Sequence, residues 1–255
     1  IDEKFLEIGR SVVINGNHHT YTTAANRAFR LKTSDIEVTF NNLNIVSTAT
    51  MIYPEDVRGI SIDPQLSNVV LTLNNCTIDF TDSTTCDWTY AVNVSGNGSG
   101  HKVTLNGGVY EGANVVNVHG SKNIVTVKNV TLNSKYPASE HYYGACIWVL
   151  QNQESSVYAE GNVFNGYNAI ALNLGTGTAL EEKDNENNTL FYNNNSKAYY
   201  ASSIEKLQYA IDNAAKSSTI KFYNDLAGDI TILQKEGINL VIDGDGHRFD
   251  VTFYL

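Results

Sequence analysis

The sequence predicts an all-β fold: a right-handed parallel β-helix of about seven rungs, followed by a C-terminal helix-plus-strand segment. A short strand and turn recur as VVINGN (12–17), VTFNNLNI (38–45), LTLNNCTI (71–78), VTLNGGVY (103–110), VTVKNVTL (125–132), VYAEGNVF (157–164) and LFYNNN (190–195). Each of these except the last is followed by a third strand, in AFRL (28–31), GISI (59–62), AVNV (91–94), VVNV (115–118), CIWV (146–149) and AIAL (169–172). Successive first strands begin 22 to 33 residues apart, a spacing that is typical of one turn of a β-helix and not of a β-hairpin.

The alternation of side chains places like residues above like when the rungs stack. Four inward ladders are expected, and each takes one apolar residue from each of several rungs. They are Val38/Leu71/Val103/Val125, Ile45/Ile78/Tyr110/Leu132/Phe164, Phe29/Ile60/Val92/Val116/Ile147/Ile170 and Leu31/Ile62/Val94/Val118/Val149/Leu172. The corner after the first strand carries Asn or Gly, which enter the left-handed backbone region at low cost. These corner residues are Asn42, Asn75, Gly107, Asn129 and Gly161.

Length variation is concentrated between the second and third strands. Residues 46–58, 79–90 and 133–145 are long there, whereas the shortest rung has only 111–114. Long loops therefore project from one edge, and loops of this kind carry specificity on a rigid scaffold. Aromatic planes beside polar groups suit sugar rings, so we predict a carbohydrate site on these loops and the adjacent strand. Its candidate residues are Trp88, Tyr90, Asp87, Tyr136, Glu140, His141, Tyr142, Tyr143 and Trp148. The alternative is that these aromatic side chains pack against the outer surface of the β-helix and hold the loops there.

Two regions are predicted, 1–198 as the β-helix and 199–255 as either the start of a second β-helix unit or a cap. Ile204, Leu207 and Ile211 recur at helical spacing, with Ser202 or Ser203 as the N-cap. Strand-like segments then resume. VVINGNHH (12–19) and LVIDGDGH (240–247) align, so the chain is expected to run from within one such unit into the opening of another.

Composition limits the function. A formal net charge of −10 argues against a nucleic-acid partner. No run of 18 apolar residues is present, so no membrane span is predicted in this chain. Three cysteines lack metal-site spacing; Cys76 with Cys86 is one pairing, and separate buried thiols, Cys146 among them, are the alternative.

These segments carry a resemblance. SIEKLQYAIDNA, TIKFYNDLAGDITI and LVIDGDGHRF, with the repeated VTLNN-TI rungs, resemble the pectin-lyase-like β-helix superfamily, and most closely its bacterial surface adhesin-like members. The resemblance covers most of the chain and implies the fold. The superfamily includes polysaccharide lyases, glycoside hydrolases, phage tailspikes and non-enzymatic adhesins, so the resemblance does not imply one activity.

The residues favour a non-enzymatic role. No ladder of acidic residues occupies the outward positions, which a hydrolase of this fold would need, and His119-Gly120 is interpreted as a turn. Asp79, Asp82 and Asp87 are the candidate ligands if calcium is bound, and Asp56 and Asp63 could lie near them. Arg58 and Arg30 would be the nearest bases for a lyase. Solvated loop acids and no cofactor are the simpler interpretation.

We therefore expect an extracellular or cell-surface, adhesin-like module that binds glycan or another host or matrix surface through one edge. A polysaccharide lyase or glycoside hydrolase acting on acidic polysaccharide is the alternative function. A structural spacer in a larger surface protein is a third.

Overall fold

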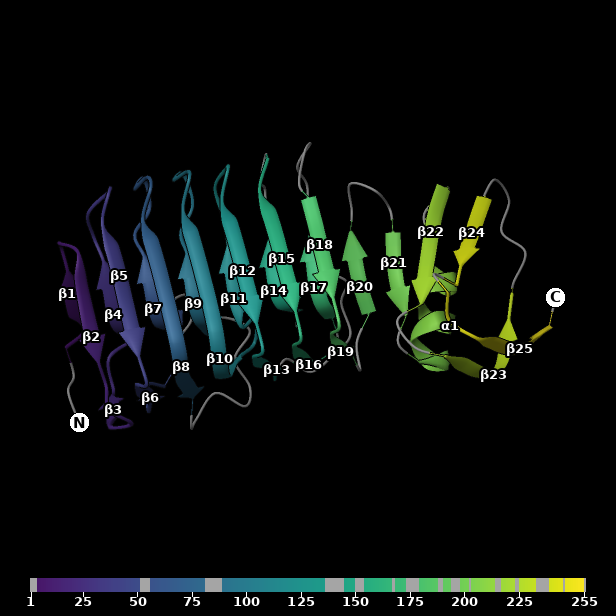
Figure 1. Ribbon diagram of the computed structural model, residues 1–255, viewed down its shortest axis with the longest axis horizontal. Helices are drawn as coiled ribbons and strands as arrows, with labels where there is room; N and C mark the ends of the chain where they lie inside the picture. Colours follow the sequence, from purple (N-terminus) through teal and green to yellow (C-terminus); the bar gives the residue numbers. More distant parts are fainter. Residues whose placement is uncertain are drawn as a thin grey trace.

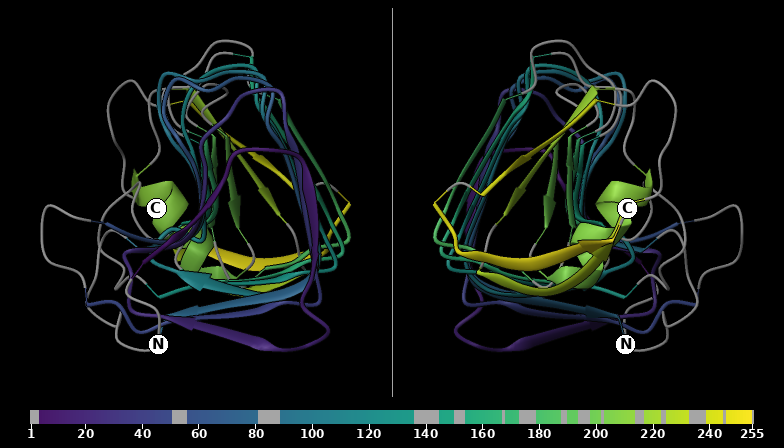
Figure 2. Two further views of the ribbon diagram at one scale, coloured as in Figure 1. Left: turned by 90° about the vertical axis from the view of Figure 1, so that its left-hand side faces the viewer. Right: turned by 90° about the vertical axis from the view of Figure 1, so that its right-hand side faces the viewer.

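The computed structural model (Figure 1) is all-β, with long parallel sheets and one short helix near the C-terminal end. It describes residues 4–50, 56–80, 89–135, 145–149, 154–166, 168–172, 179–187, 190–193, 198–201, 203–213, 217–222, 225–232, 239–244 and 246–254. Strands from successive turns of the chain lie side by side along the long axis, and the turns superimpose when viewed end-on (Figure 2).

One eleven-stranded sheet runs the length of the molecule. In spatial order its strands are β1 (Leu6–Ile8), β4 (Arg27–Leu31), β7 (Val57–Ile62), β9 (Thr89–Val94), β11 (Val116–Val118), β14 (Ala145–Val149), β17 (Asn168–Leu172), β20 (Leu190–Asn193), β21 (Ala198–Ala201), β22 (Ser217–Phe222) and β24 (Asn239–Asp243). Its third-strand ladders pair as predicted, for example Phe29 with Ile60 and Val116 with Ile147.

A twelve-stranded sheet carries the first and second strands of each turn. Its strands are β2 (Val12–Asn15), β3 (Thr20–Thr23), β5 (Glu37–Asn41), β6 (Asn44–Ser47), β8 (Val70–Phe80), β10 (Lys102–Gly112), β12 (Ile124–Lys128), β13 (Thr131–Ser134), β15 (Ser156–Glu160), β16 (Val163–Asn165), β18 (Ala179–Lys183) and β19 (Glu186–Asn187). The two sheets enclose one apolar core that extends from Ile8 to Ile170, in which Leu71, Tyr110 and Phe164 are fully buried. The predicted inward ladders are confirmed for the side chains that the structure describes, which do not include that of Leu172.

The corner between the first and second strands is also confirmed. Asn42, Asn75 and Asn129 have φ angles of 49°, 49° and 53°, and Gly107 has 67°. Asn and Gly are used because other side chains are strained in this left-handed region. β8 and β10 each continue through the corner; their pairing skips Gly107 and Asn75 and resumes in the same register at Gly108 and Cys76, so the bend does not shift the stack.

Two strand predictions for the segment that precedes residue 198 were wrong. LFYN lies in the eleven-stranded sheet as β20, paired with β17, and is not a first strand. Between AIAL (169–172) and LFYN the repeat pattern predicts no strand, but this part of the chain contains β18 and β19, which pair with β15 and β16. Backbone pairing with β15 outweighs the low strand propensity of the sequence ALEEK.

Beyond β20 the strand direction reverses, because β20 and β21 pair antiparallel. Helix α1 (Ile204–Asn213) connects the parallel strands β21 and β22, and Ser203 caps it by accepting a hydrogen bond from Lys206 N at 3.3 Å. Leu207 and Ile211 are buried in a separate apolar cluster with β22 and with β23 (Leu226–Thr231), which pairs with β25 (Phe249–Tyr254). The division at 198/199 stays a prediction.

Two predictions about chemistry and membrane contact can be compared with the described residues. Cys76 and Cys146 are buried free thiols, and Cys86 lies outside the described residues. Within the described part of the chain, no helix is both long and apolar enough to cross a membrane.

Candidate functional site

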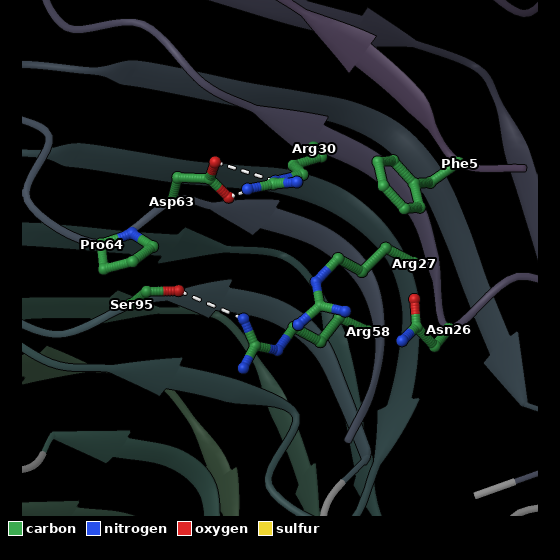
Figure 3. A pocket seen from close by; sticks show the side chains of 8 residues that line it. All are labelled: Phe5, Asn26, Arg27, Arg30, Arg58, Asp63, Pro64 and Ser95. Atoms are coloured by element: carbon green, nitrogen blue, oxygen red, sulfur yellow. Dashed lines mark hydrogen bonds and ion pairs between the residues drawn. The ribbon is translucent and has the colours of Figure 1, made fainter. Parts of the chain in front are cut away.

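Three arginines gather on the outer side of the eleven-stranded sheet, near its N-terminal end (Figure 3). Arg27 on β4 pairs with Arg58 on β7, and Arg30 lies one turn from Asp63. Gly59 permits this arrangement. A Cβ there would lie 2.7 Å from Cγ2 of the core residue Ile78, so this position faces inward at close range and Arg58 is directed outward.

Each guanidinium group is held by a specific contact. Arg30 donates from Nε to both carboxylate oxygens of Asp63, at 2.7 and 2.8 Å. Arg58 donates to Ser95 Oγ at 3.2 Å and to Asp56, and Arg27 donates to the other oxygen of Asp56 at 3.3 Å. One carboxylate is therefore shared between two arginines.

The site carries an excess of positive charge. Among the described residues, Arg27, Arg30 and Arg58 face two carboxylates, Asp56 and Asp63, which leaves one positive charge of this described set uncompensated. Glu7 does not change this count, because it forms an ion pair with Lys32 as well as a longer one with Arg30. Burial lowers the pKa of Arg27, and the nearby charge of Arg58 lowers it further. In a chain of net charge −10, this is a partly desolvated cationic site.

The arginines border a cavity of about 420 Å³. Its lining also includes Phe5, Asn26, Asp63, Pro64 and Ser95 (Figure 3). The Arg30 guanidinium lies over the Phe5 ring, 5.6 Å from its centroid, which orients a planar cation beside an apolar surface. Nε of Arg58 is buried and has no hydrogen-bond partner among the described residues. Arg58, which lines the cavity, thus has a buried donor without a partner among the described residues, and the described charges at the cavity are unbalanced.

A buried polar row continues along the same face of the sheet. Register aligns Ser61, Asn93, Asn117 and Trp148, which are at most 6% exposed and lie outside the apolar core. Asn117 donates to Asn93 Oδ1 at 2.6 Å, and Asn93 donates to Ser95 Oγ at 2.9 Å. Ser61 Oγ and Asn117 Oδ1 have no partner within the described part of the chain. Polar side chains therefore connect the arginines to the next turns.

His119 ends this polar row. Its ring lies 6.3 Å from the Trp148 ring, centroid to centroid, and it lines a second cavity of about 430 Å³ with Gly96, Asn97 and Ser121. Burial lowers the pKa of His119, and the charge of Arg58 lowers it further. His119 and Arg58 are thus electrostatically coupled.

Two of the predicted carbohydrate-site residues lie on this face of the sheet. Tyr90 pairs with Arg58, and Trp148 pairs with Asn117; both are buried, at 3% and 6% exposure. The other candidates lie outside the described residues: Asp87, Trp88, Tyr136, Glu140, His141, Tyr142 and Tyr143. Whether these residues bind sugar stays a prediction.

The acidic residues that were considered for calcium are placed apart. Asp56 and Asp63 are bound to arginines, and Asp79 on β8 lies 3.9 Å from Lys135, which also pairs with Glu111. Burial raises the pKa of Asp79, and Glu111 raises it further. Asp82 and Asp87 lie outside the described residues, and the described ranges hold no group of three or more His, Cys, Asp and Glu side chains placed to bind a metal.

Sequence reasoning named Arg30 and Arg58 only as candidate bases and did not find Arg27, Ser95 or Phe5. The repeat pattern of the sequence contains a signal that identifies Arg27. Arg27 and Arg58 each lie two residues before the inward residues Phe29 and Ile60 of the third-strand ladder, so stacking must bring them together. Phe5 has no such periodic relation to the rungs.

Comparison with known proteins gives no match: no protein family, curated protein or solved structure is significantly similar to this chain.

The coupling of His119 to Arg58 leads to a testable pKa change. An Arg58→Gln substitution removes a positive charge that disfavours the imidazolium, so we expect the pKa of His119 to rise. The titration of the imidazole resonances by NMR measures it. Arg10→Gln, on the exposed turn before β2, is the control and should leave the His119 pKa unchanged. If the pKa of His119 were the same in Arg58→Gln as in the wild type, Arg58 would not lie close enough to His119 to affect its charge, which would contradict the structure of this face.

Proposed function

We propose that the chain is a right-handed parallel β-helix of about seven rungs, of the pectin-lyase-like type, that acts as a non-catalytic extracellular module. In this proposal it binds an acidic glycan, one that carries carboxylate or sulfate groups, on the outer face of the eleven-stranded sheet. The observation that carries the proposal is the arginine site. Three of the five arginines in the sequence border one cavity, with one positive charge more than the described carboxylates there neutralise.

The chemistry of the site favours an anion of this kind. Guanidinium groups present a planar fork of donors that matches carboxylate and sulfate-like oxygens. Ser95 and Asn26 on the cavity wall add a hydroxyl and an amide group that would bind sugar hydroxyls. Phe5 and Pro64 supply the apolar part of the lining. In this proposal arginine, and not calcium, supplies the positive charge.

A polysaccharide lyase is the second candidate, and one observation favours it. The lowered pKa of Arg27 is the direction that a base requires. Arginine nevertheless stays protonated in proteins at ordinary pH. Binding of an anion uses the protonated guanidinium group, whereas a catalytic base must be deprotonated, so the binding role fits these residues better. A structural spacer remains the third candidate if no ligand is bound.

A glycan array that includes neutral, uronate-containing and sulfated oligosaccharides, run beside an assay for unsaturated uronide release, tests the proposal. We expect binding to the anionic oligosaccharides that weakens with salt, persists in a chelator, and is not accompanied by product release. Release of unsaturated uronide would establish the lyase instead. Binding confined to neutral glycans, or silence in both assays, would contradict the proposal.

A further inference from the structure

The two cavities on the outer side of the eleven-stranded sheet adjoin one another. We call the cavity lined by the three arginines the arginine cavity and the one lined by His119 the histidine cavity. Ser95 lines the arginine cavity (Figure 3), and Gly96, the next residue in the turn after β9, lines the histidine cavity. Ser95 Oγ accepts hydrogen bonds from Arg58 and Asn93, so the junction of the two cavities belongs to the arginine network. A ligand longer than one sugar unit can therefore extend from one cavity into the other.

The histidine cavity has a neutral, polar lining with one titratable side chain. Its lining comes from residues 96–99 and 119–121, the turns that follow β9 and β11. None of these residues is Asp or Glu, and His119 is the member of this set that can carry a positive charge. An anionic group in this cavity would thus meet no carboxylate among its lining residues.

The fold fixes the position of His119. Its backbone N–H donates to Val94 O at 3.0 Å, and the side-chain amide of Asn123 donates to His119 O at 2.9 Å. The ring lies edge-on near the buried ring of Trp148. Within the described part of the chain, neither ring nitrogen has a hydrogen-bond or ion-pair partner. The imidazole is therefore held at the cavity with its nitrogens unused by those residues.

Gly96 leaves the space beside the imidazole open. Among the described residues, a Cβ at Gly96 would have within 4 Å the Cβ and Nδ1 atoms of His119, both at 3.9 Å. The φ angle of Gly96 is not positive, so its backbone accepts a larger side chain. The other two glycines of the lining differ, because a Cβ at Gly98 would lie 2.4 Å from Leu66 O and one at Gly120 2.3 Å from Gly98 O. Position 96 is thus where the cavity can be filled without backbone strain.

The charged groups around His119 favour its neutral form until an anion binds. Burial lowers the pKa of His119, and the charge of Arg58 lowers it further. Lys122 in the same turn forms an ion pair with Glu154 at 3.5 Å, and His101, beyond the other turn, is buried and accepts a backbone hydrogen bond through Nδ1. β9, β11 and β14 contain no Asp, Glu, Lys or Arg. An anion on Arg58 would offset its repulsion of the imidazolium, and an anion beside the ring would stabilise the imidazolium directly.

We propose that the histidine cavity is a second subsite for an acidic oligosaccharide, in which the imidazolium form of His119 binds a further acidic group of a ligand already held by the arginines. The subsite rests on the proposed function of the arginine cavity. It adds that the ligand carries acidic groups on more than one sugar unit and that its binding takes up a proton. By linkage, the gain in affinity is complete below the pKa of His119 in the free protein and is lost as the pH rises above the pKa in the complex.

Galacturonate and its linear trimer, trigalacturonate, test the subsite by isothermal titration calorimetry. At about pH 5.5 we expect His119→Gln to weaken the binding of trigalacturonate by about tenfold and to leave that of galacturonate unchanged, because the single sugar needs the arginine cavity alone. At about pH 8, where the imidazole is neutral, the variant and the wild type should have the same affinities. His19→Gln, in the exposed turn before β3, is the control and should match the wild type. Equal affinities of His119→Gln and the wild type for trigalacturonate at both pH values would overturn the subsite.

Filling the histidine cavity tests the subsite without removing the imidazole. Gly96→Val places a side chain beside His119 and leaves the arginines in place, so we expect the trimer to bind no more tightly than galacturonate does. Gly9→Val is the matched control in the exposed turn before β2, where a Cβ would make an ordinary contact of 3.5 Å with Thr33 Oγ1. It should leave both affinities unchanged. A Gly96→Val variant that binds the trimer as tightly as the wild type would contradict the placement of the second acidic group.

Proton uptake separates this subsite from the function on which it rests. Calorimetry of trigalacturonate binding at about pH 6.5, in buffers of different ionisation enthalpy, measures the number of protons bound with the ligand. We expect uptake of a fraction of one proton by the wild type and none by His119→Gln. Binding of trigalacturonate without uptake at any pH would overturn the subsite and leave the arginine site intact. Failure of the wild type to bind either sugar would contradict the arginine site and the subsite together.

Discussion

Replacement of Tyr110 by alanine is expected to lower the free energy of unfolding by about 3–5 kcal/mol, as for other large aromatic residues in cores. Tyr110 is fully buried, and register places it between Ile78 on one turn and Leu132 on the next. Removal of the ring leaves a cavity that neither neighbour can fill, because both are fixed by strand pairing above and below. Urea unfolding followed by circular dichroism measures the loss.

Tyr110→Phe is the matched control. It keeps the ring and removes only the hydroxyl, which donates to Gly107 O at 3.1 Å at the corner of the same rung. We expect a loss of about 1 kcal/mol, typical of one hydrogen bond. If the alanine and phenylalanine variants had the same free energy of unfolding, removal of the ring would not destabilise the protein. That result would contradict the packing of this ladder.

The ladders could be predicted because they depend on strand periodicity alone. Val38, Leu71 and Val103 recur at the same place in each rung, and their inward direction follows from alternation with polar residues. The corners could be predicted for a similar reason, since the backbone geometry at Asn42 or Gly107 restricts which residues are tolerated.

Features that depend on pairing beyond the local sequence were missed. The polar segment ALEEK becomes β18 because the edge of β15 is available to it, and LFYN consequently shifts to the third-strand position as β20. The reversal between β20 and β21 has no periodic signal of its own. In each case a partner strand, and not the segment's own pattern, decides the structure.

The arginine site was missed for a different reason. Its components come from separate turns, and their importance lies in the charge balance that remains after pairing with Asp56 and Asp63. Asn93 and Asn117 occupy outward positions of their strands, yet they are buried. Strand alternation distinguishes the two faces of a sheet but not what covers the outer one.

The charge balance makes the arginine site testable with two substitutions of opposite sign. Arg58→Ala removes a guanidinium group that lines the cavity and reduces the excess charge of the described residues from one to zero, so we expect affinity for an oligogalacturonate or a sulfated oligosaccharide to fall by about 10–100-fold. Asp56→Asn removes the carboxylate shared by Arg27 and Arg58 and raises the excess to two. We expect that variant to bind the same oligosaccharide more tightly, although mutual repulsion of the two arginines lowers its stability.

Isothermal titration calorimetry at two salt concentrations measures both effects. Lys128→Ala, on the outer face of the twelve-stranded sheet, changes the net charge by the same amount as Arg58→Ala and should leave affinity unchanged. Arg58→Lys keeps the charge but loses the planar fork, so an intermediate affinity would show that hydrogen-bond geometry contributes beyond charge. If Lys128→Ala weakened binding as much as Arg58→Ala, net charge alone would explain the affinity and the cavity would not be the binding site. A loss of affinity in Asp56→Asn, with the variant folded at the temperature of the titration, would show that the carboxylate binds the ligand itself.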